Sequence, residues 1–217
     1  MKKISGLAAV SLLALACANV QAADLQVTGS IVPGSCALNI PTLSVDYGRI
    51  NAKDLSPVDY TKLDKLNTAF NITCDGPTLV GLTANDNRAA SNKYEAMEVI
   101  DPSLVNPRLS FGMGADADGG KIGSYSLKVR NYSVDGGTDF KTVANAGASW
   151  FTANDVMRSM PHFTLSWTSN NGDYNPYLLT MVSGELEIEA AINNTTELVV
   201  RDDLQIDGSA TLELKYI

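Results

Sequence analysis

The sequence predicts an all-β protein. Segments with apolar residues at alternate positions recur along the chain, and this period of two gives a strand one buried face. Clusters of turn-forming residues separate them, such as VDGGT at 134–138 and NNGDYNP at 170–176. Few segments have the apolar spacing of an amphipathic helix. Many short strands at this spacing favour a β-sandwich or barrel, and a chain of this length fits one domain.

The predicted strands follow in order along the chain. The first half contains CALNI (36–40), LSVDYGRI (43–50), LNTAFNITC (66–74) and TLVGLTA (78–84). The second half contains RLSFGMG (108–114), SYSLKVRN (124–131), FTLSWTS (163–169), GELEIEAAI (184–192), TELVV (196–200), DLQI (203–206) and SATLELKYI (209–217). One or two helical turns are predicted within 56–67 and 152–160. Residues 85–107 form an irregular connection, and the wider region 85–161 has no assigned role.

The last strand is well patterned up to the final residue. Ala210, Leu212, Leu214 and Tyr216 alternate with polar residues, and Ile217 ends the sequence. These four side chains are predicted to share the buried face.

The first 22 residues predict a signal peptide. Lys2 and Lys3 precede the apolar stretch ISGLAAVSLLALACA, which is too short to span a bilayer comfortably. Cleavage after Ala22 leaves an exported chain of 195 residues without an integral membrane segment. Cys17 raises lipidation as an alternative, although Leu15 stands one place too late for a lipoprotein signal.

Cys36 and Cys74 remain after cleavage. Two cysteines in an oxidising compartment predict one disulfide, and their separation of 38 residues gives a stabilisation of about 4 kcal/mol in the chain-entropy model. Zinc prefers about four ligands at short spacings, and the single histidine, His162, is distant in sequence. No metal and no cofactor is therefore predicted.

The charge of the chain disfavours polyanionic partners. The sequence has 16 basic and 24 acidic residues. Removal of residues 1–22, which hold two lysines and no acid, leaves a net charge of −10. An acidic surface repels nucleic acid, so no nucleic-acid partner is expected.

The sequence offers little support for catalysis. No Ser-His-Asp arrangement follows from one histidine. Asp116 and Asp118 faintly resemble the start of a calcium loop, but its later acidic ligands are missing, so a polar hairpin turn is preferred. The acidic residues of ELEIE (185–189) alternate with apolar ones, which predicts the solvent face of a strand. We predict that the protein is not an enzyme.

The start of the mature chain is the most informative segment. Leu25, Val27, Gly29 and Ile31 share one face of an extended strand. Glycine weakens a strand unless another chain must approach closely. The segment is therefore either an edge strand of the protein's own sheet or a strand made for a groove in a neighbour.

The two ends of the chain together resemble the pilins of bacterial chaperone–usher fimbriae. An exported chain begins with an alternating segment in which Gly29 lies seven residues before Cys36. Cys74 ends an alternating strand about forty residues later. Gly208 precedes a last strand that has Tyr216 next to its end. Gly208 is nearer the end than is usual in the family, the starting segment is short and the region 85–161 is long, which indicates a divergent branch.

This resemblance implies a fold and a mechanism. The fold is an immunoglobulin-like Greek-key sandwich that lacks one strand, with a signal peptide at 1–22, a donor-strand segment at 23–33 and the sandwich domain at 34–217. Leu25, Val27, Gly29 and Ile31 are the implied donor residues. A periplasmic chaperone pairs with the C-terminal strand (Ala210, Leu212, Leu214, Tyr216, Ile217), and an outer-membrane usher exchanges it for the next subunit's donor strand.

The implied function is a structural or accessory fimbrial subunit in cell adhesion, with the periplasm as its transit compartment and the cell surface as its destination. Its position in a fibre, as a major, minor, adaptor or tip subunit, stays open.

The alternative is a stand-alone periplasmic or secreted sandwich that binds a ligand, with glycan as one class. Five aromatic residues in or beside the less regular middle motivate it: Trp150, Phe151, Trp167, Tyr174 and Tyr177. Trp167 alternates with Phe163 and is predicted to lie in the core, whereas Tyr174 and Tyr177 are loop candidates.

Overall fold

The computed structural model describes residues 26–29, 34–42, 44–200 and 203–217. The chain divides into a unit of residues 1–33 and a compact unit of residues 34–217, which contains every strand described below. The predicted signal peptide, with Cys17, and the donor residues Leu25 and Ile31 lie outside the described residues. Among the described residues, no helix is long and apolar enough to cross a membrane.

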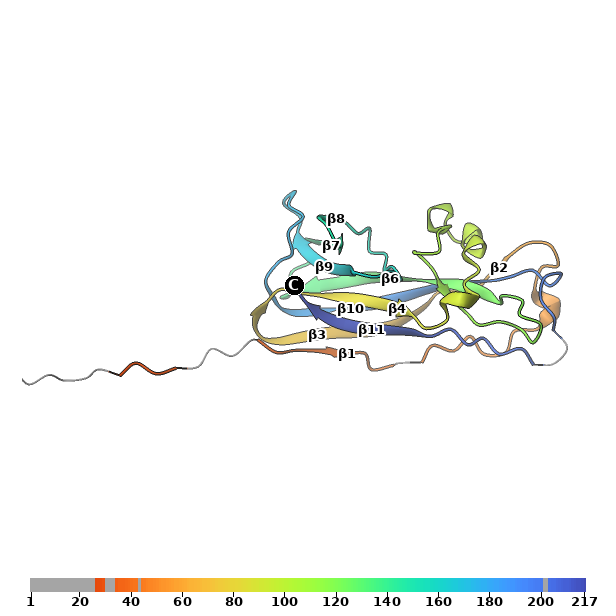
Figure 1. Ribbon diagram of the computed structural model, residues 1–217, viewed down its shortest axis with the longest axis horizontal. Helices are drawn as coiled ribbons and strands as arrows, with labels where there is room; N and C mark the ends of the chain where they lie inside the picture. Colours follow the sequence, from red (N-terminus) through yellow and green to blue (C-terminus); the bar gives the residue numbers. More distant parts are fainter. Residues whose placement is uncertain (1–25, 30–33, 43, 201–202) are drawn as a thin grey trace, which may run out of the picture. The chain divides into compact units, whose positions relative to one another are not determined.

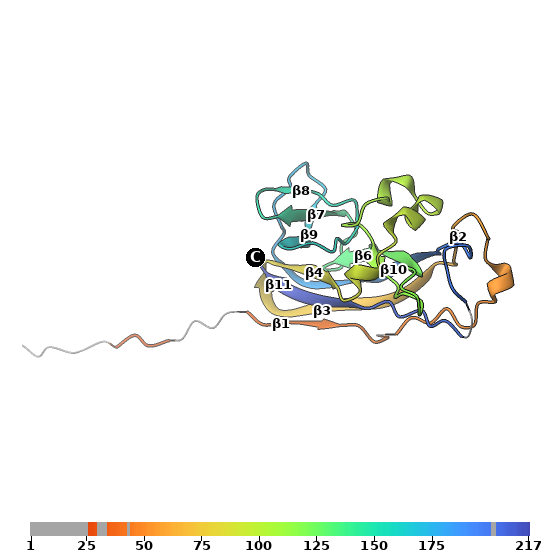
Figure 2. The same cartoon turned by 45° about the vertical axis from the view of Figure 1, so that its right-hand side comes forward.

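Residues 34–217 form a sandwich of two antiparallel sheets, which confirms the prediction of an all-β sandwich (Figures 1 and 2). The first sheet has the order β1-β3-β10-β6-β5, and β2 pairs with β10. Its strands are β1 (Cys36–Asn39), β2 (Thr61–Lys62), β3 (Leu66–Thr78), β5 (Phe111–Gly112), β6 (Gly123–Val134) and β10 (Leu179–Ile192).

The second sheet has the order β11-β4-β9-β7-β8. Its strands are β4 (Val80–Asp86), β7 (Phe140–Ala146), β8 (Trp150–Thr152), β9 (Phe163–Ser169) and β11 (Ala210–Tyr216). Four short 3-10 helices lie in the connections: η1 (Ala52–Asp54), η2 (Ala89–Ser91), η3 (Tyr94–Val99) and η4 (Pro102–Leu104).

The core lies between the two sheets and follows the alternation of their strands. Phe70 and Ile72 point inward from β3, and Leu82 and Leu165 point inward from β4 and β9; all four are nearly or fully buried. Trp167 is fully buried as predicted, and its ring stacks on that of Phe70 with centroids 6.3 Å apart. Full burial of one large apolar side chain stabilises the fold by roughly 1.5–3 kcal/mol.

Three predicted strands are wrong because side-chain hydrogen bonds or the lack of a partner strand override their alternation. Described residues 44–50 form no strand: the Asp46 carboxylate accepts from the Gly48 N–H at 2.8 Å, and Gly48 has a left-handed φ of 66°. Residues 196–200 form no strand: the chain turns at 195–197, where the Asn194 side chain accepts from the Glu197 N–H. Residues 203–206 have no strand partner among the described residues.

The two predicted helical segments are also wrong. In the first, Ser56 Oγ accepts from the Asp59 N–H, and residues 61–62 join the first sheet as β2. In the second, Asn154 and Asp155 have φ values of 53° and 62°, which an α-helix excludes. The region 85–161 is more regular than predicted, because β7 and β8 within it form the far side of the second sheet.

Candidate functional site

Two edge strands lie side by side at one edge of the sandwich (Figure 1). Among the described strands, β1 pairs only with β3 and β11 pairs only with β4. One hydrogen bond joins their ends, from the Cys36 N–H to Tyr216 Oη at 2.8 Å. The facing backbone edges of these two strands are therefore open to a further strand.

An apolar groove begins where β1 ends, at Ile40, and runs beside the first half of β11 at Ala210 and Leu212. Its cavity of about 340 Å³ reaches down to the inner face of the first sheet, where Leu127, Leu186 and Ile188 form its floor. Ile40 and Leu212 are among its walls.

The burial of the wall strands shows that the interior is incompletely covered at this edge. On β4, Val80 and Leu82 are 0% and 1% exposed. The inward residues of the edge strands, including Leu38, Leu212 and Leu214, are only half-buried. An apolar surface left half-covered in this way is typical of a binding groove.

A second cavity of about 540 Å³ continues the groove beyond the end of β11. Both cavities are lined by Val45, Tyr47 and Ile206. The second is lined by residues within 45–55, 198–200 and 203–206, which include parts of all three segments wrongly predicted as strands.

The predicted residues of the C-terminal strand lie along this groove. Ala210, Leu212 and Leu214 pack against the core, as their alternation indicates. Tyr216, by contrast, is 51% exposed and uses its hydroxyl to hold β1. The Ile217 N–H donates to the Leu79 carbonyl at 3.0 Å, so the last residue is fixed by the backbone.

Gly208 has a steric role in the groove. A Cβ at this position would lie 3.0 Å from Cε1 of the Tyr125 ring, which is tighter than ordinary contact. Gly208 and Tyr125 both line the first cavity, so the glycine lets the chain pass close over the ring.

Two of the four predicted donor residues are described, and neither belongs to a strand. Val27 is 88% exposed. No atom would contact a Cβ built on Gly29 within 4 Å.

The predicted disulfide between Cys36 and Cys74 is confirmed, with an S–S distance of 2.02 Å. The two cysteines are direct partners in the β1–β3 register. The disulfide thus fastens β1, the strand that leads into the groove at Ile40, to β3 of the sandwich.

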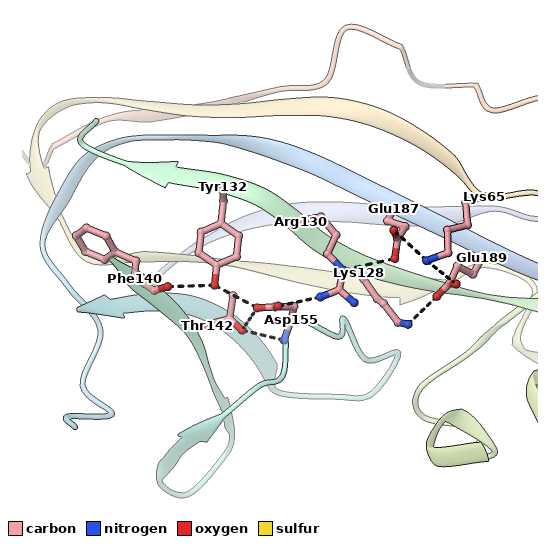
Figure 3. Close-up of polar contacts among 9 residues, drawn as sticks. All are labelled: Lys65, Lys128, Arg130, Tyr132, Phe140, Thr142, Asp155, Glu187 and Glu189. Atoms are coloured by element: carbon pink, nitrogen blue, oxygen red, sulfur yellow. Dashed lines mark hydrogen bonds and ion pairs between the residues drawn. The ribbon is translucent and has the colours of Figure 1, made fainter. Parts of the chain in front are cut away.

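A charged cluster occupies the outer face of the first sheet, where η3 packs over β6 and β10 (Figure 3). The Glu189 carboxylate receives the Lys128 ammonium at 2.6 Å and the Lys65 ammonium at 3.0 Å. Glu189 and Lys128 are only 3% and 8% exposed. The prediction that the ELEIE acids lie on a solvent face is therefore wrong for Glu189. The complementary charges of SLKVRN and ELEIE, which pair as neighbouring strands, are the signal that would have found the cluster.

A second group of contacts closes the edge of the sandwich opposite the groove (Figure 3). Arg130 donates to Asp155 at 3.0 Å, and Asp155 accepts from the hydroxyls of Thr142 and Tyr132. Because Thr142 belongs to the second sheet and Arg130 to the first, Asp155 links the two sheets. The Val129 N–H also donates to the Asp155 carbonyl. The sandwich is sealed here and open at β1 and β11.

The buried carboxylate predicts a loss of stability in acid. Burial alone raises the pKa of Glu189, but hydrogen bonds from Lys128 and Lys65 outweigh it and hold the pKa below its ordinary value of 4.5. A group with a lowered folded pKa stabilises the fold above its unfolded pKa, and this contribution is lost as pH falls through the folded value. We expect the free energy of unfolding, measured by urea denaturation, to fall below pH 4.5. The fall should be smaller in the double variant Lys128→Met/Glu189→Leu; an equal fall would assign the acid sensitivity to other carboxylates.

The remaining predicted candidates have structural roles. The Asp116 carboxylate accepts from the backbone N–H groups of Asp118, Gly120 and Val199, and these bonds hold its pKa below its ordinary value. It fixes the turn that was predicted there. Among the described residues, no group of three or more His, Cys, Asp and Glu side chains has a geometry suited to a metal ion.

The loop aromatics are exposed but already have partners. Tyr174 and Tyr177 are 48% and 40% exposed. The Lys141 ammonium lies 4.7 Å from the Tyr174 ring centroid, and the Phe140 ring meets that of Tyr177 edge-on at 5.1 Å. Trp150 and Phe151 are half-buried in β8. These rings form no open platform of stacked faces.

Fold and groove together define a disulfide-bonded all-β sandwich with one open edge. The family described as "Protein of unknown function (DUF1120)" matches residues 25–126. The chain is similar to "Protein GltF" of Escherichia coli (strain K12), with 26% identity over 226 residues, covering 89% of this chain and 88% of GltF. It is also similar to "Uncharacterized protein YhcF" of the same organism, with 26% identity over 223 residues, covering 91% of this chain and 92% of YhcF. No solved structure matches.

Proposed function

We propose that the protein is a structural or accessory subunit of a chaperone–usher fimbria, exported through its signal peptide and assembled by donor-strand complementation. The observation that carries this proposal is the open apolar groove beside the free edge of β11, between Ile40, which follows β1, and Leu212. The partners are a periplasmic chaperone, an outer-membrane usher and other subunits.

The strand order supports an immunoglobulin-like sandwich with one position unfilled. In that fold the strands A, B, E and D form one sheet and C, F and G the other. The neighbours β1, β3, β10 and β6 take the places of A, B, E and D, in the same chain order. Strands β4 and β11 take the places of C and F. The place of G is the free edge of β11, where no described strand lies.

The groove has the chemistry that an inserted strand requires. The free edges of β1 and β11 offer backbone donors and acceptors. The cavity beside the first half of β11 is lined by apolar side chains that would accept alternate residues of the insert. The segment 23–33 supplies such an alternation in Leu25, Val27, Gly29 and Ile31.

The proposal predicts that a peptide of residues 23–33 stabilises the protein. A dilute oxidised chain of residues 23–217 is heated with and without the peptide, and the melting temperature is recorded. Saturation at about 100 times Kd contributes about 2.7 kcal/mol, which for a chain of this size raises the melting temperature by roughly 5–10 °C.

Two variant peptides give the control. Ile31→Asp places a charge on the apolar face and is expected to abolish the rise. Thr28→Asp places the same charge on the opposite face and is expected to retain most of it. A melting temperature that none of the peptides changes would show that the sandwich is complete without an added strand, and the proposal would then be abandoned.

A further inference from the structure

The hydroxyl of Tyr47 is a buried polar group without a partner. Among the described residues, no group forms a hydrogen bond with its oxygen, which has no contact with solvent. Tyr47 lines both cavities and so stands where the first opens into the second. A buried donor without an acceptor destabilises the free protein, and such a group in a groove points to a ligand.

The surroundings of Tyr47 define what kind of ligand atom it would bind. Burial, together with the negative charges of Glu189 and Asp64, raises the pKa of its phenol to about 12. The group therefore keeps its proton and acts as a donor. An acceptor that matches this donor inside an inserted strand is a backbone carbonyl oxygen.

The local backbone holds Tyr47 in place. Its neighbours Asp46 and Gly48 form a tight turn, closed by the 2.8 Å hydrogen bond from the Gly48 N–H to Asp46 Oδ1. The left-handed φ of Gly48 lets the chain make this turn. The hydroxyl is thus presented by a fixed loop, which lowers the entropic cost of binding.

We propose that Tyr47 positions the strand inserted into the groove by donating a hydrogen bond to one of its backbone carbonyl oxygens. This inference rests on the proposed function and adds to it one contact that fixes how the insert lies. An inserted segment that passes from the first cavity to the second runs alongside Tyr47, which lines both.

The test compares a tyrosine hydroxyl that has no hydrogen-bond partner with one that is hydrogen-bonded within the protein. Tyr47→Phe removes the unpaired one. Tyr132→Phe removes one that is paired within the protein, at 3.2 Å from Asp155 and on the sealed edge. Binding of a fluorescein-labelled peptide of residues 23–33 and the melting temperature of the free protein are measured for both variants of the oxidised chain 23–217.

Each variant should change either the affinity for the peptide or the melting temperature of the free protein, and not both. Tyr47→Phe is expected to weaken peptide binding about fivefold to tenfold, the loss of one hydrogen bond, while the free protein melts at the same or a higher temperature. Tyr132→Phe is expected to lower the melting temperature and leave the affinity unchanged.

The outcomes separate this inference from the proposed function. If Tyr47→Phe binds the peptide as tightly as the unmodified chain does, the positioning role is wrong and the groove function stands. If Tyr47→Phe lowers the melting temperature as Tyr132→Phe does, the hydroxyl is satisfied in the free protein and the inference also fails. If the unmodified chain binds no peptide, both proposals fall.

Discussion

Replacing Glu189 by leucine is expected to lower the free energy of unfolding by about 3–5 kcal/mol. The change leaves the Lys128 ammonium, whose side chain is 10% exposed, without the carboxylate that it meets at 2.6 Å. Lys65 contributes less to this loss, because its side chain is 51% exposed and it keeps a second contact with Glu187 at 3.4 Å. Urea denaturation at pH 7 measures the effect.

The double variant Lys128→Met/Glu189→Leu separates the cost of an unpaired charge from the net worth of the pair. Replacing a buried ion pair by apolar side chains of similar size is often neutral or stabilising. We expect this variant to lie within about 1 kcal/mol of the unmodified protein. An equally large loss in both variants would mean that the pair itself stabilises the fold.

A surface pair provides the matched control. Arg49 and Asp203 form an ion pair at 3.4 Å with side chains 90% and 79% exposed. Asp203→Ala is expected to change the free energy of unfolding by less than about 0.5 kcal/mol, because water screens such a pair.

Replacing both Cys36 and Cys74 by serine is expected to cost about 4 kcal/mol, as the chain-entropy model gives for a separation of 38 residues. Without the disulfide, β1 should detach from the sheet more readily than the other strands. It has four residues and pairs with β3 alone among the described strands. Because β1 leads directly into Ile40, which lines the groove, the affinity for the 23–33 peptide should fall as well. Urea denaturation and peptide titration of the oxidised and the double-serine chains measure both effects.

A substitution on the other face of the same strand is the control. Ala37 lies between the two half-buried positions Cys36 and Leu38 and is exposed. Ala37→Ser is expected to leave stability and affinity nearly unchanged. A loss of less than about 1 kcal/mol in the double-serine variant would show that backbone pairing alone fixes β1.

The sequence by itself determined the features that depend on neighbouring residues. A period of two is a local property, so it located β3, β9 and β11 and identified Trp167 as a core residue. The count of cysteines left after cleavage was enough to predict the Cys36–Cys74 bond. Turn-forming residues marked most of the places where strands end.

Only the tertiary structure decided which strands have partners and which groups are buried. The pattern at 43–50 equals that of a true strand, but a strand needs a partner, and the described part of this segment, residues 44–50, turns at Asp46 and Gly48 instead. Glu189 looks like a solvent-facing acid until Lys128 and η3 are placed around it. The open groove and the unpaired hydroxyl of Tyr47 arise from the spacing of β1 and β11, which lie at opposite ends of the sandwich domain's sequence. Hydrogen bonds and burial between such distant segments depend on the whole fold, and no local pattern contains them.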